Sequence, residues 1–319
     1  MKIALIGSVD YDSFEYNLHE SFIYNGHQAE IFDLPAQERS SIFIRLIKDE
    51  IFMTMADEVD RYHPDLIVAV YRIINPCFVI QVKKMGYRII HINPDPVTTF
   101  SCQQLFAAEY DVYFTKDPFI KRFMESNMKL NVKLHNDAFN IRLHKKPDMD
   151  KPEFEKKIDI EVMTYGTLYP YRNRMLRLLI DAGIEIVLFG NKFPFYDHEL
   201  DKYHSGYYIT GESKAKLLYG ARIVLNTFNY AEVESVNSRF FEANGSGAFQ
   251  LSDYRPILRD LLPIDPELVS FRSIDEAIEK IKYYLQHPEE RIEIARTIYA
   301  HFVNNYTYDH LIQYLLNSI

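Results

Sequence analysis

Cysteine and tryptophan are scarce in this sequence of 319 residues, which has two cysteines and no tryptophan. Cys77 and Cys102 are too few and too far apart for a zinc site, a redox pair or a disulfide framework. We expect both to be buried thiols in a reducing compartment, and the predicted location is therefore cytoplasmic.

An excess of positive charge is also missing. Asp and Glu number 45 against 36 Lys and Arg, which gives a net charge of -9. The chain has no global positive field to attract nucleic acid, so no nucleic-acid partner is expected. The most apolar stretch, residues 66–82, contains Pro76 and is too broken to span a bilayer. A local basic patch, and with it peripheral contact with a membrane, stays open.

Glycine is sparse, and the motifs built on it are missing. The 11 glycines form neither G-x-G-x-x-G nor G-x-x-x-x-G-K-[ST], which argues against ordinary dehydrogenases and ATPases. There is no G-x-S-x-G and no H-E-x-x-H, so hydrolase chemistry is unsupported. Two D-x-D spacings, Asp10/Asp12 and Asp148/Asp150, are common by chance. We therefore expect no metal and no cofactor.

Short apolar runs alternate with segments of helical period, a pattern typical of strand-helix units on a parallel sheet. In the stretch from Ser40 to Tyr62, for example, apolar residues recur every three or four positions, which predicts a long helix. The predicted strands are residues 2–7, 28–33, 65–71, 87–93, 112–115, 131–135, 158–165, 185–189, 207–209, 222–227, 248–251 and 269–271.

Residues 142–157 interrupt the alternation with a polar, proline-punctuated stretch, which predicts an interdomain linker. The sequence therefore predicts two Rossmann-like doubly wound domains, residues 1–150 and 151–319, with the last helix a candidate to pack back on the first domain. Ligands of such folds bind at the carboxyl ends of the strands, in a cleft.

The segment from Ala221 to Tyr254 carries the clearest indication of a binding site. A buried strand ends at Thr227, and a short helix is expected to begin near Asn237 or Ser238, whose side chains suit an N-cap. The backbone N–H groups of such a helix start can hold a diphosphate. Arg239 is either a phosphate partner or a surface charge.

Two carboxylates flank this helix start. Glu234 stands in the loop before the helix, and Glu242 lies on its second turn. One carboxylate can face the cleft while the other reaches past the phosphates toward a ribose. An isolated glutamate on a helix is more often a solvated residue, but the small residues Ala243 and Gly245 favour close packing that turns Glu242 toward the domain gap.

A second loop with binding character is residues 166–172, GTLYPYR. Gly166 and Thr167 follow a predicted strand and allow close approach of phosphate oxygens, and Arg172 can supply positive charge to a leaving diphosphate. The alternative for Arg172 is a solvated residue of the first helical turn. Asn191 and Ile209, at later strand ends, are candidate walls for a sugar and a base.

In the first domain the equivalent strand ends carry Asp10, Asp12, Asn93, Asp95 and His135. These residues would face a second substrate. Asp95 lies between two prolines in a rigid loop and is our candidate for a polar or basic catalytic group, although Pro-Asp-Pro is also an ordinary turn.

Much of the second half resembles a known family. The residues that carry the resemblance are SVNSRFFEANGSGAFQLSDYRPILRDLL, VSFRSIDEAIEKIKYYLQHPEER, NNYTYDHLI, MTYGTLYPYRNRMLRLL and GARIVLNTF. They are similar to the C-terminal domain of the CgeB-like (spore-maturation) glycosyltransferases, relatives of the retaining group-1 enzymes. A weaker likeness in the first half rests on HPDLIVAVY, INPDP and YDVYFTKD.

The resemblance implies a GT-B fold and a metal-independent transfer from a nucleotide-sugar donor, with a UDP-sugar favoured and a hexosyl group expected. It also implies a retaining reaction in which Glu234 approaches the donor sugar and Glu242 binds the ribose. The acceptor, whether glycan, protein or small molecule, and the oligomeric state stay open. The alternatives are a non-hydrolysing nucleotide-sugar epimerase, a non-catalytic binding module and a scaffold protein, since fold alone does not separate them.

Overall fold

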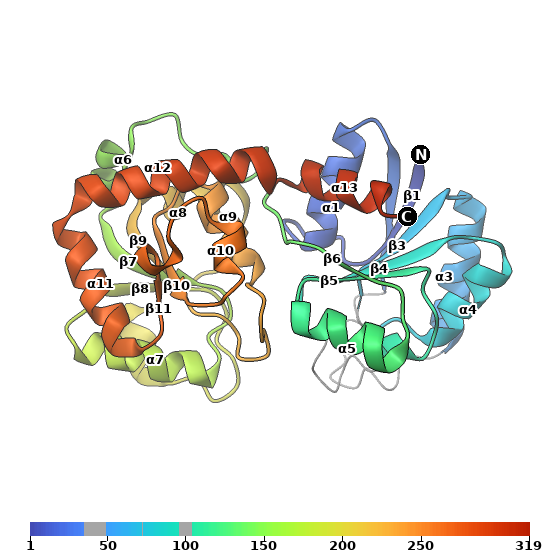
Figure 1. Cartoon of the computed structure of the whole chain (residues 1–319), viewed down its shortest axis with the longest axis horizontal. Helices are drawn as coiled ribbons and strands as arrows, with labels where there is room; N and C mark the ends of the chain where they lie inside the picture. The colour runs from blue at the N-terminus through green and yellow to red at the C-terminus, as the bar shows by residue number, and fades with distance from the viewer. Residues whose placement is uncertain (35–48, 72, 96–103) are drawn as a thin grey trace. The chain divides into compact units, whose positions relative to one another are not determined.

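The chain forms two compact units, shown in Figure 1. The structure is a computed structural model that describes residues 1–34, 49–71, 73–95 and 104–319. Unit 1 contains Met1–Asp137, Tyr230–Ser235 and Tyr308–Ile319, and unit 2 contains Ala138–Asn229 and Val236–Thr307. The first unit is therefore assembled from three separate stretches of the sequence.

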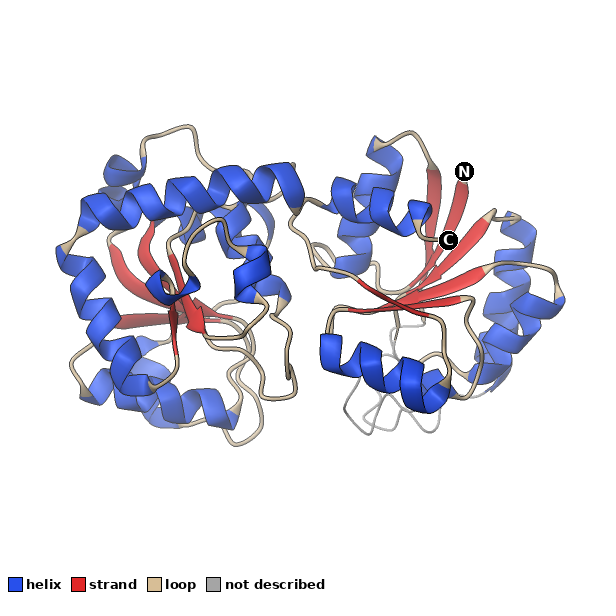
Figure 2. Ribbon diagram, in the orientation of Figure 1, coloured by secondary structure: helices blue, strands red, loops and turns tan. Residues whose placement is uncertain are grey.

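Unit 1 is built on a six-stranded parallel sheet in the order β2-β1-β3-β4-β5-β6. Helices cover its strands, as Figure 2 shows. The elements are β1 (Lys2–Ile6), α1 (Phe14–Tyr24), β2 (Gln28–Phe32), α3 (Asp49–Tyr62), β3 (Leu66–Ala69), α4 (Pro76–Lys84), β4 (Ile89–Ile92), β5 (Val112–Thr115), α5 (Pro118–Met128), β6 (Val132–Leu134) and α13 (Tyr308–Asn317).

Local chemistry fixes where these helices begin. The side chains of Ser13, Asn75 and Asp117 accept hydrogen bonds from backbone N–H groups in the first turns of α1, α4 and α5. Proline occupies the first position of α4 and α5, where no N–H is needed. The central strands β3 and β4 are buried along their whole length, which is why they read as continuous apolar runs.

The last helix, α13, packs on α1 of unit 1. The rings of Phe14 and Tyr308 meet edge to face with centroids 5.6 Å apart. Asn25, at the end of α1, donates a hydrogen bond of 3.0 Å to Asp309. The C-terminal residues thus complete the layer of helices over the first sheet.

Unit 2 has a five-stranded parallel sheet in the order β11-β10-β9-β7-β8. Its core joins the inner faces of this sheet to the surrounding helices. The elements are α6 (Lys151–Ile158), β7 (Ile160–Tyr165), α7 (Pro170–Asp181), β8 (Ile186–Phe189), η3 (His198–Tyr203), α8 (Gly211–Gly220), β9 (Ala221–Asn226), α9 (Ser238–Gly245), β10 (Gln250–Asp253), α10 (Leu258–Leu261), η4 (Pro266–Leu268), β11 (Ser270–Phe271), α11 (Ile274–Gln286) and α12 (Pro288–Asn305).

Two local predictions differ from the structure. The expected linker at 142–157 contains nearly all of helix α6. The helix packs on unit 2 because Phe154 is buried and the buried Glu155 carboxylate pairs with Arg291. The expected strand at 207–209 is absent: Tyr207 and Tyr208 are exposed, and only Ile209 is buried. The edge strand β8 instead makes an isolated bridge to His204.

Other predictions are only partly covered by the described residues. The long helix expected at 40–62 is confirmed as α3 from Asp49 onward, and residues 40–48 lie outside the described residues. Cys77 is half-buried and not fully buried, and Cys102 lies outside the described residues. None of the helices in the described ranges is long and apolar enough to cross a bilayer.

Candidate functional site

The carboxyl ends of β7, β8 and β9 meet at one edge of the unit 2 sheet. The backbones of the β7 and β8 loops touch there: a Cβ added to Gly190 would lie 2.2 Å from the carbonyl oxygen of Gly166. Gly190 also has a φ of 129°, which a side chain would strain. Leu168 donates a backbone hydrogen bond of 2.9 Å to exposed Asn191. The edge therefore presents bare backbone, as sites for phosphate groups do.

Two guanidinium groups converge on this edge from different helices. Arg172, on the first turn of α7, hydrogen-bonds the backbone oxygens of Tyr165, Thr167 and Thr227 and the hydroxyl of Thr227. Arg239, on the first turn of α9, hydrogen-bonds the oxygens of Tyr165 and Thr227 at 2.6 and 2.9 Å. In the described part of the chain, neither guanidinium forms an ion pair within 4 Å.

The two arginines differ in what they leave available. Arg172 is only 2% exposed and makes four hydrogen bonds with its five N–H groups. Arg239 is half-buried and makes two, so three of its N–H groups have no hydrogen-bond partner among the described residues. Arg172 is thus the inner support of the site, and Arg239 is the cation better placed to contact a ligand.

Charge at this edge is concentrated and desolvated. Burial, and next the neighbouring Arg239, lower the pKa of Arg172 to about 9. Asp253, at the end of β10, has a pKa raised by burial, and its carboxylate accepts the N–H of Phe228 at 2.6 Å. Two cations held side by side in a partly buried setting favour the binding of an anion.

Glu242 lies on α9, one helical turn after Arg239, and is held at both carboxylate oxygens. Lys214 of α8 donates to Oε1 at 2.8 Å, and the hydroxyl of Tyr165 lies 3.1 Å from Oε2. The exposed fractions of the Lys214 and Glu242 side chains are 6% and 16%. Burial, and then the Glu242 charge, raise the pKa of Tyr165 well above its usual value, so this hydroxyl is a donor.

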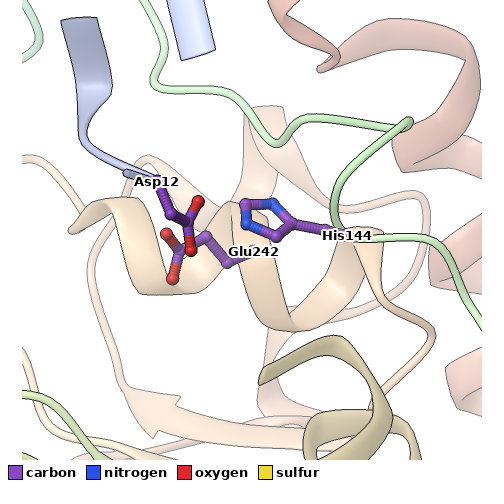
Figure 3. A group of neighbouring side chains, drawn as sticks. All are labelled: Asp12, His144 and Glu242. Carbon is purple, nitrogen blue, oxygen red and sulfur yellow. The ribbon is translucent and has the colours of Figure 1, made fainter. Parts of the chain in front are cut away.

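His144 lies close to Glu242, as Figure 3 shows. A ring nitrogen of His144 is within 4.8 Å of a carboxylate oxygen of Glu242. The imidazole is buried, and its Nδ1 lies 3.3 Å from the backbone N–H of Asn140. Glu242 is thus fixed among polar partners, and is not a solvated helix residue. Each carboxylate oxygen can accept more than one hydrogen bond, so Glu242 keeps acceptor capacity for ligand hydroxyls.

The start of α9 is fixed by an amide network. Asn237 is the N-cap and accepts the N–H of Phe240, as the sequence predicts. Its amide exchanges hydrogen bonds with Asn226 of β9, and Asn226 also donates to Gln250. This network locks the helix that carries Ser238, Arg239 and Glu242 to two strands of the sheet. Ile209 is buried in the same cluster as Tyr165.

Glu234 is placed differently from Glu242. It belongs to the Tyr230–Ser235 segment of unit 1, where its carboxylate pairs with exposed Arg122 at 2.7 Å. Its backbone N–H donates to Asp117, which also accepts the N–H and hydroxyl of Ser235. Arg239 and Glu242 are therefore brought together in unit 2, while Glu234 is anchored in unit 1.

Lys116 is a buried charge that the sequence reasoning missed. Its ammonium lies 2.7 Å from Glu232 and 3.3 Å from Asp137, and all three side chains are buried. The two carboxylates raise the pKa of Lys116 against the opposing effect of burial. No spacing rule connects these three positions, but a lone lysine directly after the buried strand β5 was a usable indication.

Three of the five unit 1 candidates lie at or just after the carboxyl ends of β4 and β6. Buried Asn93 donates to the carbonyl of Val70 and accepts the N–H of exposed Asp95. His135 is buried, and burial lowers its pKa to about 4, with a smaller contribution from Lys116. Within the described residues, Nε2 of His135 has no hydrogen-bond partner.

The remaining two, Asp10 and Asp12, lie in the turn between β1 and α1. Asp10 is exposed, and its carbonyl accepts the N–H of Ser13. Asp12 has a left-handed φ of 64° and accepts a hydrogen bond from Asn17. Both act in part as turn residues that lead into α1.

Comparison with known proteins supports this picture of the fold. Residues 172–317 match a family model described as glycosyl transferase-like. No curated protein matches the chain.

Solved structures align over almost the whole chain. Anabaena HepE in complex with UDP and glucose has a TM-score of 0.73 at 14% identity, covering 100% of both chains. Sucrose-phosphate synthase from Thermosynechococcus elongatus has a TM-score of 0.68 at 12% identity, covering 99% of this chain and 98% of that one. A glycosyltransferase from Rickettsia africae has a TM-score of 0.66 at 10% identity, covering 99% and 97%. The predicted fold, two Rossmann-like α/β units of the GT-B type, is confirmed.

Proposed function

We propose that this chain is a glycosyltransferase that takes a sugar from a nucleoside-diphosphate donor, with a UDP-sugar favoured. The observation that carries the proposal is the convergence of Arg172 and Arg239 on the glycine-lined strand ends, beside the fixed carboxylate of Glu242. The glycosyl transferase-like match over 172–317 supports it, and so does the structural likeness to HepE, a protein crystallised with UDP and glucose.

In this proposal the diphosphate lies against Arg239 and the loop of Gly166 and Thr167. The unused N–H groups of Arg239 donate to phosphate oxygens, while Arg172 holds the loop carbonyls and adds charge from behind. Glu242 accepts hydrogen bonds from the ribose hydroxyls, as anionic carboxylates do well in partly buried sites. Asn191 and Ser238 are candidates for further contacts to the donor.

The chemistry follows from where negative charge develops. As the bond between the sugar carbon and the diphosphate oxygen breaks, charge grows on the leaving diphosphate. Two guanidinium groups already fixed in a partly buried site stabilise that charge without reorganisation. We propose on this ground that two fixed cations do the work for which other transferases use a metal ion.

The finer assignments are part of the same proposal. A retaining reaction and a role for Glu234 at the donor sugar rest on its spacing from Glu242 and on the resemblance to CgeB-like enzymes. Hexosyl transfer rests on that resemblance too. Asp95 stays our candidate for a catalytic group on the acceptor side, with Asp10, Asp12, Asn93 and His135 as acceptor contacts.

The binding test is a thermal-shift titration with UDP, GDP and dTDP. A nucleotide at about 100 times its dissociation constant stabilises by roughly 2.7 kcal/mol, a shift of several degrees. We expect UDP to give this shift for the wild type and for Arg259→Gln, an exposed arginine of α10. Arg239→Gln should abolish it. Equal thermal shifts in Arg259→Gln and Arg239→Gln would show that the diphosphate does not bind at this edge of the sheet.

The catalytic test follows the donor by NMR with the full chain. A transferase consumes UDP-glucose and releases UDP slowly to water and faster when an acceptor is present. An epimerase would convert the donor without releasing UDP, and a binding module would leave it unchanged. Loss of UDP release in Glu242→Gln, with Glu279→Gln on α11 as the control, would support the assigned site.

A further inference from the structure

A small pocket lies in unit 2 between the chain that leads into α6, the end of α8 and one face of α12. Two of its lining residues, Tyr219 and Gly247, come just before β9 and β10, so the pocket is at the amino ends of the strands. Its volume is about 100 Å³, which holds a small ion but no drug-sized ligand. Its polar and aromatic lining residues are Lys146, Asp150, Lys151, Tyr219, Arg296 and Tyr299.

Positive charge dominates this lining. Lys146, Lys151 and Arg296 contribute three cations, and the lining holds one carboxylate, that of Asp150. Within the described part of the chain, neither Lys146 nor Asp150 forms an ion pair within 4 Å. Arg296 pairs with Glu293 of its own helix at 2.7 Å, but 66% and 64% of these side chains are exposed. Because exposed pairs contribute little, Arg296 can exchange this partner for a ligand.

A buried surplus of positive charge lies behind the pocket. Lys151 is 5% exposed, and its ammonium lies 3.5 Å from the Glu155 carboxylate. Arg291, which is 1% exposed, already holds that carboxylate at 2.7 and 2.8 Å. Two buried cations therefore share one buried carboxylate. Burial, opposed by this carboxylate and reinforced by Arg291 and Lys146, lowers the pKa of Lys151 to about 8. An anion in the pocket would offset the surplus charge.

The two lysines approach the same aromatic ring. Nζ of Lys151 lies 4.7 Å from the centroid of the Tyr219 ring, and Nζ of Lys146 lies 5.5 Å from it. Gly247 leaves room for this arrangement, because a Cβ there would lie 3.2 Å from the Tyr219 ring and 3.3 Å from the Lys146 side chain. Like charges held close together and partly away from water favour the binding of an anion.

Tyr299 adds a hydrogen-bond donor that carries no charge. Its ring centroid lies 5.8 Å from Nζ of Lys146. Among the described residues its hydroxyl has no hydrogen-bond partner, so the hydroxyl can donate to a ligand. The pocket thus combines two accessible cations and a hydroxyl, which are groups that bind oxyanions.

We infer that this pocket binds an oxyanion of the phosphate class, held by Lys146, Arg296 and the Tyr299 hydroxyl. Lys151 adds charge from behind. A phosphoryl group carries about 1.5 to 2 negative charges near pH 7, which matches the two unbalanced cations of the lining. The inference does not rest on the proposed donor site, because that site is at the carboxyl ends of the strands. It holds whether or not a nucleotide binds there.

The test is a titration of the full chain with inorganic phosphate, followed by the broadening of the ³¹P NMR signal at an ionic strength held constant with sodium chloride. It is made in the Arg239→Gln variant, so that phosphate bound at the proposed donor site does not contribute. Adding Lys146→Gln or Arg296→Gln should weaken binding about tenfold. The control is Lys145→Gln, which removes an exposed neighbouring lysine outside the lining and should leave binding unchanged.

A second titration with glycerol phosphate identifies the source of the anion. Tighter binding of the ester than of inorganic phosphate would assign the pocket to the phosphoryl group of a larger molecule. Tighter binding of inorganic phosphate would assign it to the free ion. Either result supports the oxyanion site, provided that Lys146→Gln weakens binding.

Two outcomes overturn the inference. One is the absence of broadening with both phosphate compounds. The other is an equal loss of binding in Lys145→Gln and Lys146→Gln, which would show attraction to diffuse surface charge. A melting temperature in chloride buffer checks the fold of each variant. If Lys146→Gln melts below its parent, Arg296→Gln decides the test, because that side chain is exposed and contributes little to the fold.

Discussion

Arg172 and Arg239 donate hydrogen bonds to the same two backbone oxygens, those of Tyr165 and Thr227. These oxygens lie at the carboxyl ends of neighbouring strands β7 and β9. Two like charges are thereby tied to one pair of carbonyls, although their helices are far apart in the sequence. The pair divides into an inner arginine that supports the loops and an outer one with donors to spare.

The first prediction separates these two roles. Arg172→Ala removes the donors for Thr167 and the Thr227 hydroxyl, and should lower the free energy of unfolding by roughly 3 kcal/mol. In Arg239→Ala, the backbone oxygens of Tyr165 and Thr227 keep Arg172 as a hydrogen-bond donor. The free energy of unfolding should therefore fall by less than about 1 kcal/mol. Urea unfolding followed by circular dichroism measures both. Equal losses would contradict the division of roles.

A second prediction concerns the partner of Glu242. Lys214→Met leaves a carboxylate that is only 16% exposed without its cation, so the carboxylate loses its fixed orientation. We expect the dissociation constant for UDP to rise about tenfold, which corresponds to about 1.4 kcal/mol. Titration calorimetry provides the measurement.

Lys214→Met has two control variants, one at Lys214 itself and one at another lysine of α8. Lys214→Arg should recover most of the affinity for UDP, because the charge is restored. Lys216→Met, which removes an exposed lysine paired with Glu212, should bind UDP like the wild type. If Lys216→Met weakens binding as much as Lys214→Met, the effect is not due to Glu242.

A third prediction tests the buried charges of unit 1. Lys116→Met leaves Asp137 and Glu232 buried without their cation and should destabilise the fold by about 3–5 kcal/mol. Adding Glu232→Gln should recover part of the lost stability, because it removes one of the two buried carboxylates that have lost their cation. Lys121→Met breaks a half-exposed pair on α5 and should lower the free energy of unfolding by less than about 1 kcal/mol. Denaturation midpoints should be lowest for Lys116→Met, higher for Lys116→Met with Glu232→Gln, and highest for Lys121→Met. Any other order would argue against a structural role for Lys116.

A fourth prediction concerns acid stability. The pKa of His135 is lowered to about 4 by burial, whereas an unfolded histidine titrates near 6.5. Between these values the unfolded chain binds a proton that the folded chain does not, so stability falls as the pH falls from 6.5 to 4. The contribution is about 3 kcal/mol. Comparing His135→Gln with the wild type over this pH range should show a flatter profile for the variant.

The control for the acid prediction is an exposed histidine. His287→Gln, at the start of α12, should keep the pH profile of the wild type. A wild-type profile for His135→Gln as well would assign the acid sensitivity to other groups.

Local patterns predicted the regular elements well. The apolar runs gave the eleven strands of the described structure within a few residues, because buried parallel strands need continuous apolar sequence. Asn237 was recognisable as a helix cap, since capping depends only on neighbours in the chain. The expected strand at 207–209 was wrong because a β-strand also requires a pairing partner, and an apolar run does not supply one.

The sequence did not predict which residues from distant parts of the chain form ion pairs. Glu242 and Arg239 were candidates because of their position at a helix start, but nothing marked Lys214 as the cation for Glu242. The same holds for Lys116 with Glu232, which lie far apart in the chain. Ion pairs of this kind depend on how the helices and strands pack. A single sequence does not indicate which residues from distant elements come within ion-pair distance.

The three-part composition of unit 1 has a consequence for the order in which the protein folds during synthesis. Its sheet is complete once β6 has been made, but the carboxylate of Glu232 and the helix α13 arrive only much later. Until then Lys116 lacks the carboxylate of Glu232, and the face of α1 that packs on α13 is uncovered. The N-terminal half should therefore stay only partly stable on the ribosome, and reach its final state after α13 has emerged.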